Sequence, residues 1–432
     1  MPGYMKRVLQ VKQPLRGEIS VPGDKSIGHR AVIFGSIAHG ISRVSNLSGG
    51  EDNRRTVQAF KDMGVKIWTE GEFLCIDGRG PEGLAPPKNT IDCGNSGTTM
   101  RLLSGVLAGR PFTTVLDGDR SLRQRPMRRV IDPLTRMGAH LVSHEDKGLA
   151  PLEITGGKLK SIDYPMPIPS AQVKSAIVLA GLQAEGVTTV EEPQNSRDHT
   201  ELMIKGFGGE VTVNGRRVSL RGGQKLYARD VQIPGDISSA AFFLVAAALI
   251  PQSRVVVRGV GVNPTRDGVI EVLRRMGAQI EVLGARIETG EPVADLKVTG
   301  SRLKGVEVGS DLVARTIDEY PILAVAAALA DGVTVINGAR ELRFKESDRI
   351  MAMSEGLGRL GVTVEEREDG MTIHGREVLQ GNNVRSFADH RVAMALAIAG
   401  ICAEGGVEID DPQCVDISFP AFFDLLGKLC LR

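Results

Sequence analysis

The most regular feature of the chain is a repeat of roughly seventy residues that recurs six times. In five copies an apolar helix pattern ends in glycine, and a segment of alternating apolar and polar residues follows. These glycines are Gly64, Gly138, Gly208, Gly277 and Gly361, and Gly427 marks a last, truncated copy. Glycine is favoured just after a helix because it adopts left-handed backbone, and the alternation is typical of a half-buried strand. Each repeat is therefore predicted to be a βαβαββ element.

Three segments are apolar on nearly every side: residues 240–249, 322–329 and 392–401. A helix that is hydrophobic all round has no face for water and is expected to be buried. We therefore predict an α/β protein of two lobes, each with three repeats, in which the helices lie inside and the sheets lie outside.

Two turns of nearly the same sequence lie about half the chain apart, at Val21–Asp24 and at Ile233–Asp236. A chain of 432 residues is also too long for one hydrophobic core. We predict one lobe over residues 21–234 and a second made of 1–20 plus 235–432, with hinges near 21–24 and 233–236. A cleft between two lobes is a favoured place for small substrates.

The overall composition is that of an ordinary globular protein, with 42% hydrophobic residues, 24% charged residues and a net charge of +1. Nucleic acid is not favoured as a partner, because the net charge of +1 gives no strong positive field and only 4% of the residues are aromatic. Five scattered cysteines lack metal-ligand spacing and are predicted to be reduced. The sequence predicts a cytoplasmic monomer without a membrane segment. It does not choose between Met1 and Met5 as the start.

The segment Pro22–Arg30 carries the clearest candidate chemistry. It predicts a turn, Asp24 as N-cap and a helix over residues 26–37, with Lys25, Ser26 and Arg30 at its start. A helix N-terminus attracts anions through its unpaired N–H groups and its dipole, and the two cations add to that attraction. The segment alone is equally consistent with an ordinary capped helix that carries surface cations.

Polar clusters recur at the starts of other predicted helices. They are residues 95–101, 120–126, 169–175, 195–200, 316–321, 344–349 and 387–391. Pro126 is predicted to start a helix. Each cluster has a simple alternative: residues 120–126 form a solvated basic loop, Asp318 is a helix cap, and residues 345–349 pair along a helix face. Because the clusters fall at equivalent points of the repeat, we predict that they build one cationic site, with Asp318 and Glu346 available for acid–base chemistry.

Several other chemistries have no sequence support. The chain has no Walker loop, no GxGxxG after a strand, and no HExxH, GxSxG or kinase signature. No cluster of metal ligands is evident either. The predicted chemistry uses side chains alone, with no cofactor and no metal.

Together the motifs resemble those of the 5-enolpyruvylshikimate-3-phosphate (EPSP) synthases over essentially the whole chain. They are PGDKSIGHR at 22–30, GNSGTTMR at 94–101, RQRP at 123–126, PSAQ at 169–172, SRDHTE at 196–201, IDEYP at 317–321, KESDR at 345–349 and DHR at 389–391. The resemblance implies the two-lobed enolpyruvyl transferase fold, an inside-out α/β barrel in each lobe. It also implies transfer of the enolpyruvyl group of phosphoenolpyruvate to the 5-hydroxyl of shikimate-3-phosphate, with release of phosphate, on the route to chorismate and aromatic amino acids.

The resemblance also implies residue roles. Contacts to shikimate-3-phosphate are implied for Lys25, Ser26, Arg30, Ser170, Gln172, Arg197, Asp318 and Lys345. Contacts to phosphoenolpyruvate are implied for Lys25, Gly97, Arg125, Gln172, Arg349 and Arg391. In an addition followed by an elimination, Asp318 is the candidate base for the hydroxyl, Glu346 exchanges the proton at the methylene carbon, and Lys25 bridges the substrate and the leaving phosphate.

Three positions depart from patterns seen in this family. Ile417 stands where many members have a lysine, Ala171 where some have a second serine, and Arg197 where others have a tyrosine. These departures place the chain nearer the bacterial branch that includes herbicide-tolerant members. Gly97 leaves room that an alanine methyl would fill, so glyphosate is expected to inhibit the protein.

Two other interpretations are open. A UDP-N-acetylglucosamine enolpyruvyl transferase shares the fold and the chemistry, but it should carry Lys-Asn at 25–26 and a cysteine in the loop over 120–125, where this chain has none. A non-catalytic anion-binding protein built from the same repeats would not need Asp318 and Glu346 beside the cations.

Overall fold

The computed structural model describes residues 5–144 and 147–430, so the choice between Met1 and Met5 lies partly outside the described residues. The chain forms two compact units. The first unit contains residues 23–233 with 288–291, and the second contains residues 5–22, 234–287 and 292–430.

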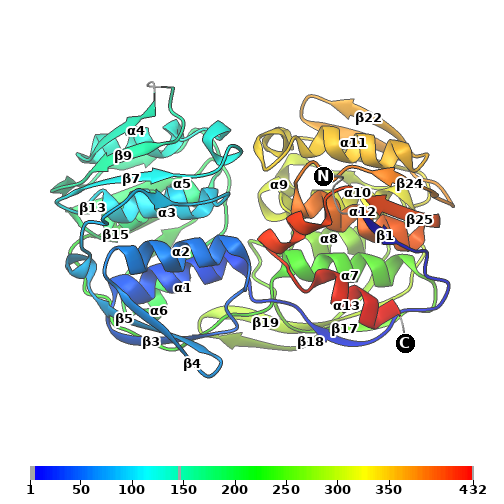
Figure 1. Ribbon diagram of the computed structural model, residues 1–432, viewed down its shortest axis with the longest axis horizontal. Coiled ribbons are helices and arrows are strands. Elements are labelled where there is room, and N and C mark those ends of the chain that lie inside the picture. The colour runs from blue at the N-terminus through cyan, green and yellow to red at the C-terminus, as the bar shows by residue number, and fades with distance from the viewer. Residues whose placement is uncertain (1–4, 145–146, 431–432) are drawn as a thin grey trace. The chain divides into compact units, whose positions relative to one another are not determined.

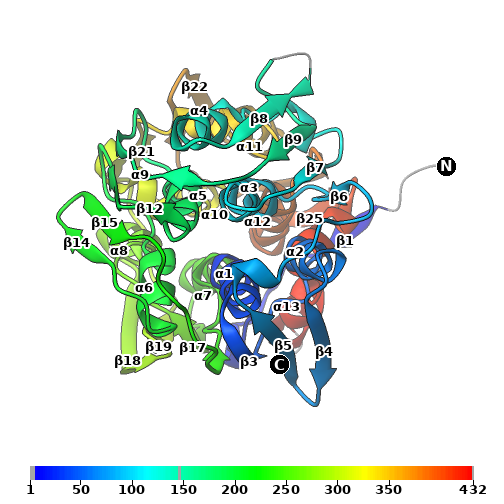
Figure 2. The same cartoon turned by 90° about the vertical axis from the view of Figure 1, so that its left-hand side faces the viewer.

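The first unit is built from three βαβαββ repeats whose sheets lie around the outside of its helices (Figure 2). The first repeat contains α1 (Lys25–Ile37), β3 (His39–Ser45), α2 (Glu51–Asp62), β4 (Lys66–Glu70), β5 (Phe73–Arg79) and the later strand β16 (Val231–Gln232). The second contains β6 (Ile91–Asp92), α3 (Gly97–Leu107), β7 (Thr113–Asp117), α4 (Arg128–Met137), β8 (His140–Ser143) and β9 (Leu152–Thr155). The third contains β11 (Asp163–Pro165), α5 (Ala171–Gly181), β13 (Val187–Glu191), α6 (His199–Gly206), β14 (Thr212–Asn214) and β15 (Arg217–Arg221), and a small sheet pairs β10 (Leu159–Lys160) with β12 (Ala184–Glu185).

The second unit repeats the pattern. Its first repeat contains β2 (Arg16–Ser20), α7 (Ile237–Leu249), β17 (Arg254–Gly261), α8 (Gly268–Arg275), β18 (Gln279–Glu288) and β19 (Glu291–Thr299). The next contains β20 (Glu307–Val308), α9 (Ser310–Thr316), α10 (Tyr320–Ala328), β21 (Val333–Ile336), α11 (Arg349–Arg359), β22 (Thr363–Arg367) and β23 (Gly370–His374). The last contains β24 (Gln380–Val384), α12 (His390–Cys402), β25 (Glu404–Ile409) and α13 (Phe422–Cys430), and β1 (Lys6–Val8) pairs with β25 in place of the usual hairpin.

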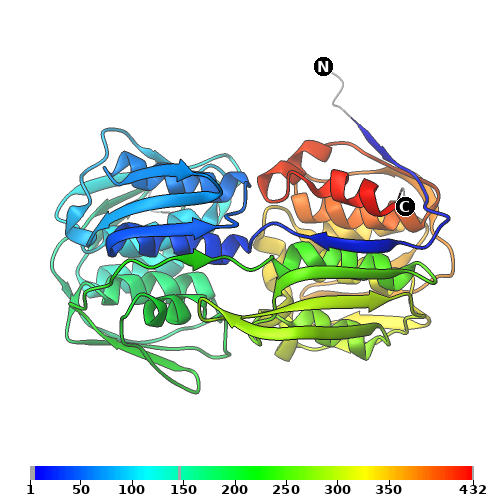
Figure 3. The same ribbon diagram turned by 90° about the horizontal axis from the view of Figure 1, so that it is seen from below.

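The sheets of the two first repeats exchange strands. β2 precedes α1 in the chain but pairs in parallel with β17 of the second unit, where it appears as the dark blue strand beside green strands in Figure 3. Conversely, β16 precedes α7 but pairs in parallel with β3 of the first unit. Each first repeat thus contains a strand from a distant part of the chain, so residues 5–20 belong structurally with the second unit.

The apolar segments form buried helices. α7, α10 and α12 lie side by side in the core of the second unit (Figure 1), and nearly all their residues are buried. The glycines at the repeat junctions also behave as predicted, because Gly64, Gly138, Gly208, Gly277 and Gly361 all have positive φ. The prediction for Gly427 is wrong. It lies inside α13, which continues to Cys430 and packs Leu429 in the core.

The tip of the β18–β19 hairpin, residues 288–291, groups with the first unit, although the rest of the hairpin belongs to the second. Within the first unit, the buried Glu291 Oε1 lies 2.7 Å from His199 Nδ1. Thr289 Oγ1 accepts a bond of 3.1 Å from the Gln232 amide. The chain therefore crosses from one unit to the other at this hairpin tip as well as at the two Pro-Gly turns. The sequence pattern did not indicate the crossing at the tip.

Two further features follow from the described residues. All five cysteines are free, and Cys75, Cys93 and Cys414 are buried, which agrees with the predicted reduced state. Among residues 5–144 and 147–430, no helix has the length and apolar character needed to cross a bilayer.

Candidate active site

The start of α1 is capped as predicted, and it presents Lys25. The Asp24 carboxylate accepts a bond of 2.9 Å from the Ile27 amide. The Lys25 ammonium lies 2.8 Å from the carboxylate of Asp52, which stands in the first turn of α2. The Asn53 amide holds the Lys25 carbonyl oxygen from the same helix. Asp52 is thus an ion-pair partner of a candidate site residue, and none of the predicted polar clusters contained it.

Arg30 is buried one turn further along α1, and its guanidinium joins three elements. Its Nε donates to Thr200 Oγ1 and its Nη2 to Ser175 Oγ, both at 2.7 Å, and its Nη1 donates to the Ser26 carbonyl at 2.9 Å. Burial lowers the pKa of Arg30 to about 10, although Glu201 opposes that shift. Arg30 therefore remains charged at neutral pH and fixes α1 against α5 and α6.

The start of α3 brings two arginines together around Gly97. Ser96 caps the helix by accepting a bond from the Thr99 amide. A Cβ atom added to Gly97 would lie 3.0 Å from Arg101 Nη1 and 3.4 Å from Arg125 Nη1. Both guanidiniums are buried, so the backbone of Gly97 lies directly against two positive charges. Arg101, which the motif analysis included in a motif but not in the site, belongs to this cluster.

Partner side chains fix both arginines. Arg101 donates to the Gln172 amide oxygen, and the Gln172 nitrogen donates to Thr98 Oγ1 at 2.9 Å. Arg125 donates to the Asn95 amide oxygen. The prediction that Pro126 starts a helix is wrong, because α4 begins at Arg128. The Pro126 carbonyl oxygen instead accepts a hydrogen bond from Arg101.

The third repeat contributes the starts of α5 and α6. Ser170 caps α5 through the Val173 amide, and Arg197 lies half-buried just before α6. Beneath them, the ammonium of the buried Lys174 lies 2.8 Å from the carboxylates of both Glu192 and Glu201. Burial alone would lower the pKa of Lys174, but these two carboxylates raise it.

The charged and polar side chains at the starts of α1, α2 and α3 and their partners are treated together below. We call Lys25, Asp52, Arg101, Arg125 and Gln172 the Lys25 group.

In the second unit, several cationic side chains surround Asp318. Asp318 does not cap a helix, since α10 begins two residues later and Glu319 occupies its N-cap position. Its Oδ1 lies 3.3 Å from the Lys345 ammonium and 3.6 Å from Arg349 Nη1. Arg391 Nη1 donates to the Asp318 carbonyl oxygen at 3.1 Å. The interpretation of Asp318 as a simple cap is therefore wrong.

Arg349, the first residue of α11, is the most constrained of these cations. Its Nε lies 2.8 Å from Asp389 and its Nη2 lies 2.7 Å from Glu346. Among the described residues, its buried Nη1 has no hydrogen-bond partner. Burial would lower the pKa of Arg349, but Asp389 and Glu346 raise it above its usual value. Asp318, Lys345, Glu346, Arg349 and Arg391 are called the Asp318 group below.

Two further charged residues lie against the Asp318 group, and Ile417, which stands where many family members have a lysine, lies apart from these charges in its packing. Asp389, which caps α12, and Arg266, at the start of α8, both lie against it. Ile417 is half-buried and packs against the hydrophobic core. Across the described residues, no group of three or more His, Cys, Asp or Glu side chains is arranged to hold a metal ion.

A buried histidine supports the Lys25 group. His29 Nδ1 lies 2.7 Å from Thr56 Oγ1, which lies 2.7 Å from Thr99 Oγ1. These bonds join α1, α2 and α3 behind the site. Burial lowers the pKa of His29 to about 3, so the ring is neutral in the folded protein.

We expect His29 to make folding sensitive to acid. The unfolded chain binds this proton near pH 6.5 and the folded chain only near pH 3. Stability from His29 is therefore complete above about pH 6.5 and falls by about 1.4 kcal/mol per unit as the pH drops. Between pH 6.5 and 5, the His29→Asn variant should lose about 2 kcal/mol less than the wild type in urea unfolding. His140→Asn, at an exposed site, is the control, and equal losses in all three proteins would contradict the prediction.

The comparison with known proteins fits this arrangement. The family described as EPSP synthase (3-phosphoshikimate 1-carboxyvinyltransferase) matches residues 9–426. The chain belongs to the EPSP synthase family. The 3-phosphoshikimate 1-carboxyvinyltransferase of Geobacter sulfurreducens is 53% identical over 418 residues, 97% of each chain. The enzyme of that name from Bacillus cereus is 51% identical over 425 residues, 98% of this chain and 99% of that protein.

Solved structures agree. The EPSP synthase of Acinetobacter baumannii has a TM-score of 0.88 and 46% identity, covering 98% of both chains. The enolpyruvyl transferase NikO of Streptomyces tendae has a TM-score of 0.79 at 18% identity over 99% of this chain and 98% of that one, so it shares the fold. These likenesses confirm the resemblance and the enolpyruvyl transferase fold, and they identify the protein as an enzyme. The two other interpretations, a UDP-N-acetylglucosamine transferase and a non-catalytic protein, are not favoured.

Proposed function

We propose that the protein transfers the enolpyruvyl group of phosphoenolpyruvate to the 5-hydroxyl of shikimate-3-phosphate and releases phosphate. Membership of the EPSP synthase family over nearly the whole chain supports this reaction. The observation that carries it is the Asp318 group, where a carboxylate for proton transfer lies among Lys345, Arg349 and Arg391. A site of this kind suits two anionic substrates that exchange protons.

The binding roles are proposed residue by residue. Shikimate-3-phosphate is bound by Lys25, Ser26, Arg30, Ser170, Gln172, Arg197, Asp318 and Lys345. Phosphoenolpyruvate is bound by Lys25, Gly97, Arg125, Gln172, Arg349 and Arg391. The Arg349 Nη1 atom, which has no hydrogen-bond partner among the described residues, supports its role because a buried donor gains most from an anionic ligand. Arg30 already binds Ser26, Ser175 and Thr200, so its share in holding the substrate is partly to fix Ser26.

The proposed chemistry is an addition followed by an elimination. The 5-hydroxyl oxygen bonds to carbon 2 of phosphoenolpyruvate while its proton passes to Asp318, and Glu346 gives a proton to carbon 3. Loss of a proton from carbon 3 back to Glu346 then re-forms the double bond as the carbon–oxygen bond to phosphate breaks. The proton that Asp318 accepted leaves with the phosphate, and Lys25 stabilises the charge on this leaving group. The Asp318 carboxylate that accepts the proton lies 3.3 Å from the Lys345 ammonium and 3.6 Å from Arg349 Nη1, whose charges attract it.

The deciding experiment measures phosphate release by the purified protein from the two substrates, without added metal, with mass analysis of the product. The expected result is release that requires both substrates and yields the enolpyruvyl ether. Phosphate release without the ether, or no turnover with either substrate bound, would contradict the proposal.

Glyphosate inhibition and its dependence on Gly97 form the next prediction. An alanine methyl at residue 97 would meet Arg101 at 3.0 Å and Arg125 at 3.4 Å, so an anion held by these arginines must shift. We expect Gly97→Ala to weaken glyphosate inhibition roughly tenfold or more, and to raise the KM for phosphoenolpyruvate less. The matched control is Gly358→Ala on α11, where an added Cβ meets nothing within 4 Å. Unchanged inhibition in Gly97→Ala would show that glyphosate does not bind at this glycine.

The remaining expectations are that the enzyme works in the cytoplasm, as a monomer and without a cofactor. Size-exclusion chromatography with light scattering tests the monomer directly. A dimer that persists on dilution would contradict it.

A further inference from the structure

Arg266 is a buried cation beside Asp318 that none of the recognised motifs contains. Its side chain comes from the turn before α8 and is 3% exposed. Arg266 Nη1 lies 3.7 Å from Asp318 Oδ2, the oxygen turned away from Lys345 and Arg349. Cations thus approach both oxygens of the Asp318 carboxylate.

The other nitrogen of this guanidinium is anchored to the start of α7. Arg266 Nη2 donates to Ser238 Oγ at 2.8 Å and lies 3.3 Å from Asp236 Oδ1 and 3.8 Å from Glu319 Oε1. Asp236 caps α7 and its amide donates to the Pro22 carbonyl at 2.9 Å. Because three buried or half-buried carboxylates surround it, Arg266 has few alternative positions.

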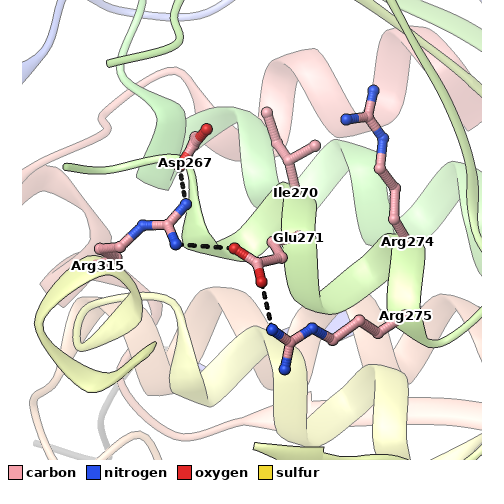
Figure 4. Close-up of a pocket in the computed structure, with 6 residues that line it drawn as sticks. All are labelled: Asp267, Ile270, Glu271, Arg274, Arg275 and Arg315. Carbon is pink, nitrogen blue, oxygen red and sulfur yellow. Dashed lines mark hydrogen bonds and ion pairs between the residues drawn. The ribbon is translucent and has the colours of Figure 1, made fainter. Parts of the chain in front are cut away.

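The turn that carries Arg266 is also fixed. The Arg266 amide donates to the Asn263 carbonyl at 2.8 Å, and Asn263 Oδ1 accepts from the Thr265 amide at 2.9 Å. The next residue, Asp267, lines a surface pocket where it pairs with Arg315 of α9 (Figure 4).

The same pocket ties α8 to α9. Arg315 also lies 2.8 Å from Glu271, and Glu271 in turn pairs with Arg275 (Figure 4). A Cβ atom on Gly268 would lie only 2.5 Å from Thr316, so the start of α8 packs closely on the end of α9. Asp318 follows α9 by two residues, so these contacts hold Arg266 and Asp318 in one framework.

We infer that Arg266 is a positioning residue for the proposed reaction, because it holds the Asp318 carboxylate in the orientation and charge state that accept the hydroxyl proton. The inference rests on the proposed role of Asp318. Among the described residues, the charged side chains that face Asp318 include Lys345, Arg349 and Arg266, while Arg391 binds its carbonyl oxygen. Glu319 follows it in the chain, and Glu346 reaches the cluster through Arg349. Loss of Arg266 removes one positive charge beside the Asp318 carboxylate and one of the contacts that fix the position of that carboxylate.

The test compares the wild type with Arg266→Gln, Arg266→Lys and the control Arg302→Gln, which removes an exposed arginine outside these contacts. In Arg266→Gln we expect kcat to fall roughly 10- to 100-fold, since misplacement of a reacting group has effects of that size. The KM for phosphoenolpyruvate should change little. The acidic limb of the kcat–pH profile should move to higher pH, because the carboxylate loses a stabilising charge. Arg266→Lys should restore that limb more than it restores kcat.

A double-mutant cycle with Asp318→Asn separates positioning from a general loss of structure. If Arg266 acts through Asp318, then Arg266→Gln has almost no further effect on kcat once residue 318 is asparagine. Effects that multiply independently, or an unchanged pH profile in Arg266→Gln, would overturn the inference. If Arg266→Gln does not fold, the same cycle is run with Arg266→Gln/Glu319→Gln, which removes a carboxylate along with the cation.

The wild type distinguishes this inference from the proposed function. A wild type that does not form the enolpyruvyl ether contradicts the proposed function itself. A wild type that turns over normally, with an Arg266→Gln variant that matches it in kcat and pH profile, contradicts only the role of Arg266.

Discussion

Glu346→Gln is expected to lower kcat by about 10²- to 10⁴-fold, the range that a positioned proton donor typically contributes. Glutamine has almost the same shape and still accepts a hydrogen bond from Arg349, which lies 2.7 Å from the Glu346 carboxylate. It has no proton to exchange with carbon 3 of phosphoenolpyruvate. Substrate affinity should therefore change far less than turnover. The measurements are phosphate release at saturating substrate and calorimetric titration of each substrate.

The matched control for this change is Glu355→Gln on α11, a half-buried glutamate that pairs with Arg359. It should keep wild-type turnover. Full activity in Glu346→Gln would remove Glu346 from the mechanism. Loss of turnover together with loss of both affinities would indicate that Glu346 serves mainly to hold Arg349 and the site around it.

Lys174→Met is expected to destabilise the folded protein by about 3–5 kcal/mol. The Lys174 side chain is 2% exposed, and its ammonium lies 2.8 Å from each of Glu192 and Glu201. Methionine fills a similar volume but leaves both carboxylates buried without their shared counter-charge. Urea unfolding of the wild type and the variant at pH 8 measures the effect.

Two comparisons test this second prediction further. Lys205→Met removes an exposed lysine from α6 and should change stability by less than about 0.5 kcal/mol. Lys174→Met/Glu192→Gln should recover part of the loss, because one uncompensated charge is removed. A deficit in Lys174→Met no larger than that of Lys205→Met would show that the ion cluster contributes little.

Much of the fold was predictable because its signals are local. The glycines that end helices, the caps at Asp24, Ser96 and Ser170, and the all-round apolar character of α7, α10 and α12 each depend on residues within a few positions of one another. The candidate cations were predictable for the same reason, since each lies in a short polar cluster at a helix start. Some local signals misled: Pro126 does not start a helix, Gly427 does not end one, and the explanation of Asp318 as a simple helix cap is wrong.

Partner choice was not predictable from such signals. Arg30 meets Thr200 across 170 residues of sequence, Lys25 meets Asp52 across 27, and Arg266 meets Ser238 across 28. Nothing in the local sequence of Asp52 or Arg266 distinguishes them from ordinary surface charges. Their burial follows from how the helices of a unit pack, and burial is what makes an ion pair or a neutral histidine significant.

The amino-acid sequence alone thus established the repeats, the buried helices, the family resemblance and the charged helix starts. The exchange of β2 and β16, the extra passage at residues 288–291 and the anchoring of Asp318 by Arg266 emerged only from the folded chain. The physical reason is the distance along the chain over which each kind of interaction acts. Backbone preferences and periodicity act over a few residues, whereas strand exchange and buried charge networks depend on contacts between segments that only packing brings together.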